Sequence, residues 1–306
     1  MKIAVTGIAG FIGSNLADRL LAEGHEVVGI DNLAYGVFEQ VPSGADFRKI
    51  DIRDENLAQH LRGVDTLFHL AAKNSIADCQ ADPLDAADVN VRGTVNVLVA
   101  AQTAEVRKVV LAESSALYEG SKTLPTPESE VAPRSFYAVS KFGAMYFADA
   151  FARYRGMNLT ALRYLCVYGP RQDYRRTIPP VMSAFIIKLL KDERPVIYGD
   201  GSKRRDFVYV DDVNDFHLRC IDDARTDGNT YNLGGGRNYS VREIYDAIAA
   251  MLGRSIEPEY RADQPGEAYE NLGDITAARA LGWEPRVTLP EGLAHSIDYI
   301  RNVLSL

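Results

Sequence analysis

Short apolar runs alternate with longer segments of helical periodicity through the first half of the chain. The apolar runs predict strands at residues 2–6, 26–31, 46–50, 65–70, 107–113 and 159–164. The segments between them predict helices near 12–23, 54–62, 84–104 and 135–155. Because strands that alternate with helices usually form parallel sheets, we expect an α/β fold with a doubly wound parallel sheet and helices on both faces.

The second half of the chain is interrupted by turn-forming residues. Glycine and proline cluster at 169–170, 179–180, 199–201 and 234–236. After the last of these clusters, Ser240 and Glu243 have the spacing of a helix capping box and predict a helix that extends to Leu252. We therefore expect a smaller C-terminal α/β lobe beside the main sheet.

A glycine-rich turn follows the first predicted strand. Gly7, Gly10 and Gly13 stand three residues apart, between that strand and the first predicted helix. Glycines at this spacing let the backbone turn tightly and bring amide N–H groups to a pyrophosphate. The second predicted strand ends at Asp31, an acid placed to accept the hydroxyl groups of an adenosine ribose. The turn predicts a Rossmann-type dinucleotide site, and Asp31 favours NAD over NADP because a 2′-phosphate would meet its carboxylate.

Composition and charge narrow the classes of partner. The 306 residues carry a formal net charge of −8, which argues against a general nucleic-acid surface and against attraction to anionic membranes. The 3 cysteines lie far apart and the 5 histidines have no metal-ligand spacing, so we expect neither a disulfide framework nor a metal site. We find no signal peptide and no apolar run of membrane-spanning length, so the expected location is the cytoplasm.

Three further residues predict a catalytic group. Tyr137 and Lys141 are one helical turn apart in the segment 135–155, where an ammonium beside a phenol favours the phenolate. Ser114 closes the strand predicted at 107–113 and offers a hydroxyl group at its end. A tyrosine in that setting can serve as a base near neutral pH. We expect Ser114, Tyr137 and Lys141 to be the catalytic residues.

With these residues in place, the chain resembles the extended short-chain dehydrogenase/reductase family, and within it the NAD-dependent nucleotide-sugar epimerases. The resemblance runs from Lys2 to about Leu293. The motifs that carry it are Thr6–Gly13, Asp31–Leu33, Asp51–Asp54, His69–Ala72, Asn90–Thr94, Tyr137–Lys141, Leu162–Tyr164, Val167–Arg171, Arg205–Val213 and Leu281–Trp283.

The resemblance implies how the chain is divided and which residues bind which ligand. Residues 1–167, with a return segment near 206–235, are the expected dinucleotide-binding domain, and residues 168–205 and 236–306 the expected substrate-binding lobe. The residues implied for NAD are Gly7, Gly10, Phe11, Ile12, Gly13, Asp31, Asn32, Asp51, Ile52, Leu70, Ala71, Ala72, Lys73, Tyr137, Lys141, Tyr164 and Val167. The residues implied for a UDP-sugar are Ser75, Ser114, Ser115, Cys166, Thr177, Val196, Tyr198, Arg205, Gln264, Glu267 and Asn271. The resemblance also implies a homodimer, formed through the helical stretches 84–104 and 135–155.

The residues after Ser114 bear on the reaction. Dehydratases of the family carry Asp and Glu in the next two positions, where this chain has Ser115 and Ala116. The resemblance therefore implies epimerisation at C4 of a UDP-hexose or UDP-N-acetylhexosamine, in which Tyr137 takes the C4 hydroxyl proton and NAD takes and returns the hydride. A nucleotide-sugar reductase, dehydrogenase or dehydratase on the same fold stays open, and so does a dinucleotide-binding regulator without catalysis.

Several positions depart from the family pattern. Cys166 stands where the family usually has Asn, and Gln264 stands where it has Arg. Glu119 replaces the glycine that usually follows the tyrosine at position 118, and Gly120 comes one residue later. Asn271 occupies the position at which a bulky Tyr excludes an N-acetyl group in some relatives. Because Asn is smaller than Tyr, we expect a UDP-N-acetylhexosamine to be accepted.

Overall fold

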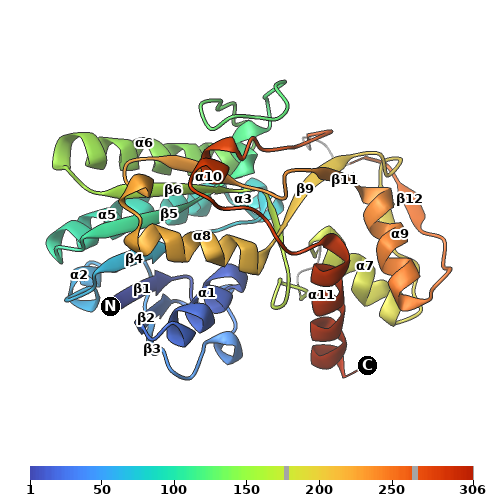
Figure 1. Ribbon diagram of the computed structural model, residues 1–306, viewed down its shortest axis with the longest axis horizontal. Coiled ribbons are helices and arrows are strands. Elements are labelled where there is room, and N and C mark those ends of the chain that lie inside the picture. Colours follow the sequence, from blue (N-terminus) through green and yellow to red (C-terminus); the bar gives the residue numbers. More distant parts are fainter. Residues whose placement is uncertain (176–178, 264–267, 306) are drawn as a thin grey trace. The chain divides into compact units, whose positions relative to one another are not determined.

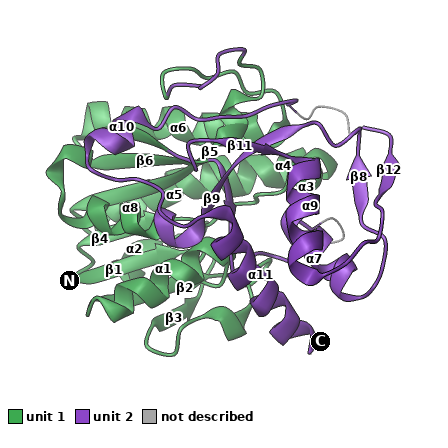
Figure 2. Ribbon diagram, turned by 45° about the vertical axis from the view of Figure 1, so that its right-hand side comes forward, with its two compact units in different colours: residues 1–121, 128–164, 214–232 green, residues 122–127, 165–213, 233–306 purple. Residues whose placement is uncertain are grey.

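A computed structural model describes residues 1–175, 179–263 and 268–305 of the chain. It divides the chain into two compact units, which Figure 2 distinguishes by colour. Unit 1 comprises residues 1–121, 128–164 and 214–232, and unit 2 comprises residues 122–127, 165–213 and 233–306. We describe each unit by itself.

Unit 1 is built on a sheet with the strand order β10-β6-β5-β4-β1-β2-β3. Its strands are β1 (Lys2–Thr6), β2 (Glu26–Asp31), β3 (Asp46–Lys49), β4 (Thr66–His69), β5 (Lys108–Ser114), β6 (Leu159–Tyr164) and β10 (Thr230–Leu233). The strands from β3 to β6 pair in parallel throughout. The strand order reverses between β1 and β4, and in such sheets the crevice at the carboxyl ends of the strands beside this point binds ligands.

Helices connect these strands. They are α1 (Phe11–Ala22), α2 (Leu57–His60), α3 (Ile76–Ala81), α4 (Pro83–Ala87), α5 (Thr94–Thr103), α6 (Phe136–Arg155) and α8 (Val210–Asp222), with short turns η1 (Phe38–Gln40), η3 (Ser115–Tyr118) and η4 (Ala224–Thr226) and a π-helical segment η2 (Asp88–Gly93). Figure 1 draws α6 on one side of the strands and α1 on the other. The doubly wound, Rossmann-type α/β fold that the sequence predicts is thereby confirmed.

The core of unit 1 explains why these segments fold as they do. Val28, Leu67 and Val109 on the strands pack with Val97 and Leu98 of α5, and each is at most 1% exposed. Burying one such side chain stabilises the fold by about 1.5–3 kcal/mol. Both faces of the sheet are covered, which explains why its strands have nearly continuous apolar sequences instead of alternating apolar and polar residues.

Two predicted helices differ from the structure. The stretch 84–104 forms α4, η2 and α5 rather than one regular helix, and the stretch 54–62 forms only the short α2. In η2 the Asn90 side chain bonds the backbone of Lys73, and a Cβ at Gly93 would lie 2.7 Å from Ile52 Cδ1. The irregular turn is thus tied to tertiary contacts that periodicity does not reveal.

Unit 2 is smaller and mixed. It holds the sheet β11-β9-β7 and the parallel pair β8 and β12, the strands being β7 (Cys166–Tyr168), β8 (Val196–Tyr198), β9 (Arg204–Tyr209), β11 (Asn238–Ser240) and β12 (Glu259–Arg261). Its helices are α7 (Val181–Leu190), α9 (Val241–Leu252), α10 (Thr276–Ala280) and α11 (Leu289–Leu304). The predicted capping box is present, because Ser240 and Glu243 bond each other's backbone N–H at 2.6 and 3.0 Å. The smaller C-terminal lobe is confirmed.

Within the ranges 1–175, 179–263 and 268–305, no helix combines the length and the apolar character needed to cross a bilayer.

Candidate active site

The glycine-rich turn lies at the switch point of the unit 1 sheet. Gly7 has φ +77°, and a Cβ there would stand 2.8 Å from the backbone nitrogen of Ala71, in the loop after β4. A Cβ at Gly13 would stand 2.2 Å from the carbonyl oxygen of Gly7. Only glycine therefore lets the β1 turn, the β4 loop and the start of α1 approach this closely. The turn leads through Gly10 into Phe11 and Ile12 of α1, whose first amide groups are available to a pyrophosphate.

Asp31 ends β2 beside this turn. Its carboxylate accepts hydrogen bonds from Ala9 N at 3.1 Å and from Leu33 N at 2.8 Å, and burial raises its pKa. A carboxylate has lone pairs for more than two donors, so Asp31 can also accept a ribose hydroxyl. A 2′-phosphate at this place would meet a negative charge. The glycine cradle and Asp31 together fit NAD.

Asn32 and Asp51 form the next group along the same edge. Asn32 Nδ2 donates to Asp51 Oδ2 at 2.8 Å, and Arg53 binds both Asp51 oxygens at 2.8 and 2.7 Å. The hydrogen bonds from Arg53 lower the pKa of Asp51 strongly. Ile52, which stands between Asp51 and Arg53 in the sequence, is 6% exposed and belongs to the core. These contacts hold the carboxylate ionised and in a fixed orientation.

The β4 loop from Leu70 to Lys73 is held by Asn90, a residue to which sequence reasoning assigned no role. Asn90 Oδ1 accepts from Lys73 N at 2.8 Å, and its Nδ2 donates to Lys73 O at 3.0 Å and to Ser140 Oγ at 2.9 Å. Ser140 in turn donates to Tyr137 O at 2.8 Å. One amide of η2 therefore joins the β4 loop, which holds Ala71 and Ala72, to the helix that carries Tyr137. The only sign of this role in the sequence is that Asn90 begins the motif Asn90–Thr94.

His69, at the end of β4, is a second residue that links β4 to η2 and α5. Its ring bonds Thr6 Oγ1 at 2.8 Å and Thr94 Oγ1 at 3.0 Å, and burial lowers its pKa to about 3. Thr94 gives its own proton to Asn90 O at 2.7 Å. It follows that His69 Nε2 carries a proton toward Thr94, while Nδ1 accepts from Thr6. The ring is neutral, and its two hydrogen bonds connect β1 and β4 with the start of α5, next to η2.

The predicted catalytic residues lie on β5 and α6 of unit 1. Ser114 Oγ accepts from Ala116 N at 3.1 Å, which fixes the hydroxyl oxygen at the start of η3. Tyr137 is the second residue of α6 and is half-buried. Lys141 is buried one turn later and donates from Nζ to Ala112 O at 2.5 Å. Burial lowers the Lys141 pKa to about 8, while the charge of Glu113 acts in the opposite direction.

Three other predicted residues of unit 1 have structural partners. Lys73 Nζ pairs with Asp85 at 2.7 Å, and Ser75 caps α3 by accepting from Asp78 N at 3.1 Å. The phenol of Tyr164 is buried and bonds His217 Nε2 at 2.7 Å. Ser115 is the first residue of η3.

Unit 2 holds described residues predicted for the substrate and one, Val167, predicted for NAD. Arg205, on β9, donates from Nη1 to the carbonyl oxygens of Arg204 and Tyr269 at 2.9 and 3.3 Å. Val196 and Tyr198 lie on β8, whose partner is β12. Val167 lies on β7 beside Val208 of β9.

Cys166, which departs from the family pattern, lies beside Asn271 in unit 2. Asn271 Nδ2 faces Cys166 Sγ at 3.8 Å, and Asn271 Oδ1 accepts from Asp206 N at 2.7 Å. Asp206 is fully buried and accepts from Gly235 N at 2.6 Å and from Gly273 N at 3.2 Å. Burial raises its pKa to about 6.

Thr177, Gln264 and Glu267, which were also predicted to bind substrate, lie outside the described residues.

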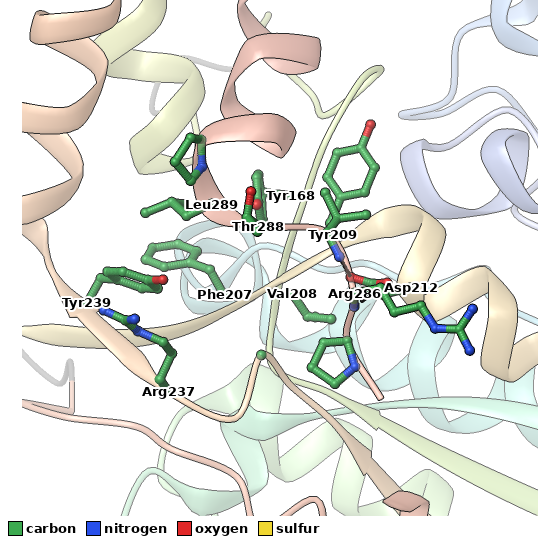
Figure 3. A pocket seen from close by; sticks show the side chains of 14 residues that line it. Tyr168, Phe207, Val208, Tyr209, Asp212, Arg237, Tyr239, Arg286, Thr288 and Leu289 are labelled. Carbon is green, nitrogen blue, oxygen red and sulfur yellow. Dashed lines mark hydrogen bonds between the residues drawn. The ribbon is translucent and has the colours of Figure 1, made fainter. Parts of the chain in front are cut away.

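Unit 2 also holds a cavity of about 330 Å³, shown in Figure 3. Tyr168, Phe207, Tyr239 and Leu289 line it, and the Arg237 guanidinium stacks over the Tyr239 ring at 4.3 Å. Of the residues predicted to bind substrate, those that the structure describes do not line this cavity. Among the residues that the structure describes, no cluster of His, Cys, Asp or Glu has the arrangement of a metal site.

Comparisons with known proteins agree with this arrangement. Residues 3–234 match the model of the NAD dependent epimerase/dehydratase family. UDP-glucose 4-epimerase of Mycolicibacterium smegmatis is 39% identical over 312 residues, covering 99% of each chain.

Two solved structures share the whole fold. UDP-glucose 4-epimerase of Thermotoga maritima, solved with UDP-glucose, superposes with a TM-score of 0.96 at 35% identity and covers 99% of this chain and 100% of its own. UDP-N-acetylglucosamine 4-epimerase of Methanobrevibacter ruminantium, in complex with UDP-N-acetylmuramic acid, has a TM-score of 0.94 at 30% identity and covers 100% and 99%. The chain therefore belongs to the NAD-dependent epimerase/dehydratase family, with NAD as its cofactor.

Proposed function

We propose that this enzyme inverts the configuration at C4 of a UDP-hexose or UDP-N-acetylhexosamine. The observation that carries the proposal is the group Ser114, Tyr137 and Lys141. The two residues directly after Ser114 are Ser115 and Ala116, where the dehydratases have an acidic pair. Epimerisation needs one carbinol carbon to be oxidised and then reduced, and no acid–base pair at C5 and C6. The relatives named above, which act as 4-epimerases, support this assignment.

The residues of unit 1 supply the acid–base chemistry. Bound NAD would supply the hydride acceptor for C4 of the sugar and the hydride donor for its opposite face. Tyr137 takes the proton of the C4 hydroxyl and later gives it back, while Ser114 donates a hydrogen bond to the C4 oxygen. The buried ammonium of Lys141 favours the phenolate of Tyr137, because an opposite charge stabilises the ionised form. Gly7, Gly10, Gly13 and Asp31 would hold the pyrophosphate and the adenosine ribose.

The residues of unit 2 are proposed to bind the UDP part. A guanidinium matches phosphate oxygens as a fork, so Arg205 is assigned to the diphosphate. The backbone of Val196 and Tyr198 on β8 is assigned to uracil. Asn271 is assigned to the sugar, where its small side chain leaves room for an N-acetyl group, and Cys166 is assigned to the substrate nearer the diphosphate.

A second reading is a nucleotide-sugar reductase or dehydrogenase that releases its cofactor at each turnover. The observation that favours it is Cys166, which stands where the family usually has an Asn that reaches the substrate diphosphate. The two readings differ in cofactor retention. An epimerase regenerates NAD in each cycle and gains by holding it tightly, whereas a dehydrogenase must exchange it.

Two measurements test the proposal. Purified protein is denatured and its supernatant examined by ultraviolet absorbance for released NAD. In parallel, UDP-glucose, UDP-galactose and their N-acetylated counterparts are incubated with the enzyme, and the C4 configuration is followed by proton NMR. We expect released NAD and conversion in both directions without added cofactor. No conversion, or conversion that requires stoichiometric added NAD, would contradict 4-epimerase activity.

We further propose that the protein is a homodimer. Large apolar side chains stay exposed on the paired helices α5 and α6, among them Val99 at 48%, Val139 at 50%, Tyr146 at 59% and Phe147 at 47%. A second copy of the same two helices would cover this face across a two-fold axis. Multi-angle light scattering at micromolar concentration should give twice the mass of one chain, and a monomer mass would refute the assignment.

A further inference from the structure

Glu119 makes a set of contacts that the reaction described above does not use. It follows η3, and its carboxylate accepts hydrogen bonds from Arg134 N at 3.0 Å, from Ser135 N at 2.7 Å and from Ser135 Oγ at 2.8 Å. All three donors lie at the N-terminus of α6. The carboxylate therefore fastens the turn after Ser114 to the helix of Tyr137, and every residue involved belongs to unit 1.

Ser135 is the point at which this contact enters the helix. It is the N-cap of α6, and its Oγ accepts from Ala138 N at 3.1 Å while its proton goes to Glu119. The cap hydroxyl is thus held from both sides. Tyr137 comes two residues after the cap, in the first turn, where a helix otherwise frays most easily.

The backbone around Glu119 closes onto the same segment. Ala132 N donates to Leu117 O at 2.7 Å, and Gly120 N donates to Ala132 O at 2.9 Å. A Cβ at Gly120 would lie 2.8 Å from Arg134 Nε and 2.9 Å from Ala132 O, so the close approach requires glycine at 120. In this order, Glu119 places its carboxylate at the N-terminus of α6, and Gly120 fits the crowded position that follows because it has no Cβ.

We propose that Glu119 is a positioning residue, whose carboxylate sets the N-terminus of α6 and so places Tyr137 relative to Ser114. Ser114 is fixed at the other end of the same turn, through the bond from Ala116 N. In this assignment Glu119 acts through Ser135 rather than through contact with substrate or cofactor. Its negative charge also lies at the positive end of the helix dipole, which strengthens the attachment.

The inference rests on the proposed function, because its effect is measured on turnover. Glu119→Ala removes all three contacts, and a small displacement of a catalytic group is costly in rate. We expect kcat to fall about ten-fold, with KM for the UDP-sugar changed less than about two-fold and bound NAD retained. Glu119→Gln keeps an oxygen for the two backbone donors and an amide group beside Ser135 Oγ. We expect it to restore kcat to within about three-fold of wild type.

The matched control is Glu291→Ala. Glu291 caps α11 in unit 2 by accepting from Thr288 N at 2.9 Å and from Thr288 Oγ1 at 2.6 Å, whereas α6 belongs to unit 1. This variant should lose thermal stability as Glu119→Ala does, but leave kcat unchanged. A loss of kcat that merely follows stability would appear in both variants.

Three outcomes overturn the inference: Glu119→Ala with kcat within about two-fold of wild type, Glu119→Gln as slow as Glu119→Ala, or an equal loss in Glu291→Ala. Failure of the proposed function is distinguishable, since wild type would then convert none of the sugars in the panel. Circular dichroism and the amount of NAD that co-purifies show that each variant is folded.

Discussion

Arg163 binds Glu113 inside the core of unit 1, with Nε at 2.9 Å and Nη2 at 2.8 Å from the same carboxylate oxygen, Oε2. The two side chains are 2% and 4% exposed. Arg163 Nη1 also donates to Tyr118 Oη and to Glu128 O, both at 2.8 Å. Glu113 immediately precedes Ser114 on β5, so this buried pair fixes the end of the strand that presents the hydroxyl proposed to act in catalysis.

Glu113→Ala should destabilise the protein severely. It leaves the Arg163 charge buried with no carboxylate partner, and breaking a buried pair in this way costs about 3–5 kcal/mol of unfolding free energy. Urea denaturation of the NAD-bound protein measures the loss. The double variant Glu113→Leu with Arg163→Met, which removes both charges, should lose less than the single variant. A single variant that loses under about 1 kcal/mol would show that Arg163 is solvated or finds another partner.

Tyr137→Phe should abolish turnover while leaving NAD bound. The phenol is the proposed base, and loss of general base catalysis costs about 10²-fold or more in kcat. Tyr154→Phe is the matched control, because Tyr154 lies on the same helix but is 77% exposed. Its kcat should equal that of wild type. Activity of Tyr137→Phe within about three-fold of wild type would remove Tyr137 from the mechanism.

The fold could be predicted from the sequence because its signals are local. The runs at 2–6, 26–31 and 159–164 coincide with strands β1, β2 and β6, since each run is apolar and flanked by turn residues. The Ser240 capping box lies within four residues of sequence. By contrast, the break at η2 depends on bonds between Asn90 and residues 73 and 140, which no local pattern reveals.

The site could be predicted in part for the same reason. Glycine spacing and the Tyr137–Lys141 repeat are visible along the chain, whereas the partners that hold these residues are distant in sequence. The sequence shows Glu119 only as a departure from a motif, because its role depends on Arg134 and Ser135. The pairing of Cys166 with Asn271 joins residues more than a hundred positions apart, and it became visible only in the structure.

Two buried histidines should make the protein sensitive to acid. Burial lowers the pKa of both His69 and His217 to about 3, from an ordinary value of 6.5. Below pH 6.5 the unfolded chain binds protons that the native state does not bind until about pH 3. The free energy of unfolding therefore falls with decreasing pH in this window, by about 1.4 kcal/mol per pH unit for each histidine.

His217→Gln isolates one of these contributions. Asp206 acts in the opposite direction, because burial raises its pKa to about 6, so the slope of wild type alone is not decisive. The comparison of slopes is decisive, since Asp206 is present in both proteins. Denaturant titrations between about pH 6.5 and 5 should give His217→Gln a slope smaller by about 1.4 kcal/mol per pH unit. Equal slopes would mean that His217 is protonated in the native state.

Asn271→Tyr should separate the two classes of substrate. The larger ring would fill the room proposed for an N-acetyl group, so kcat/KM for the UDP-N-acetylhexosamine should fall far more than kcat/KM for the plain UDP-hexose. Some loss on both is expected, because Tyr cannot replace the bond that Asn271 Oδ1 accepts from Asp206 N at 2.7 Å. The ratio of the two kcat/KM values therefore carries the test, with the plain hexose as the internal control. If both substrates lose equally, Asn271 acts only through Asp206 and does not border the sugar.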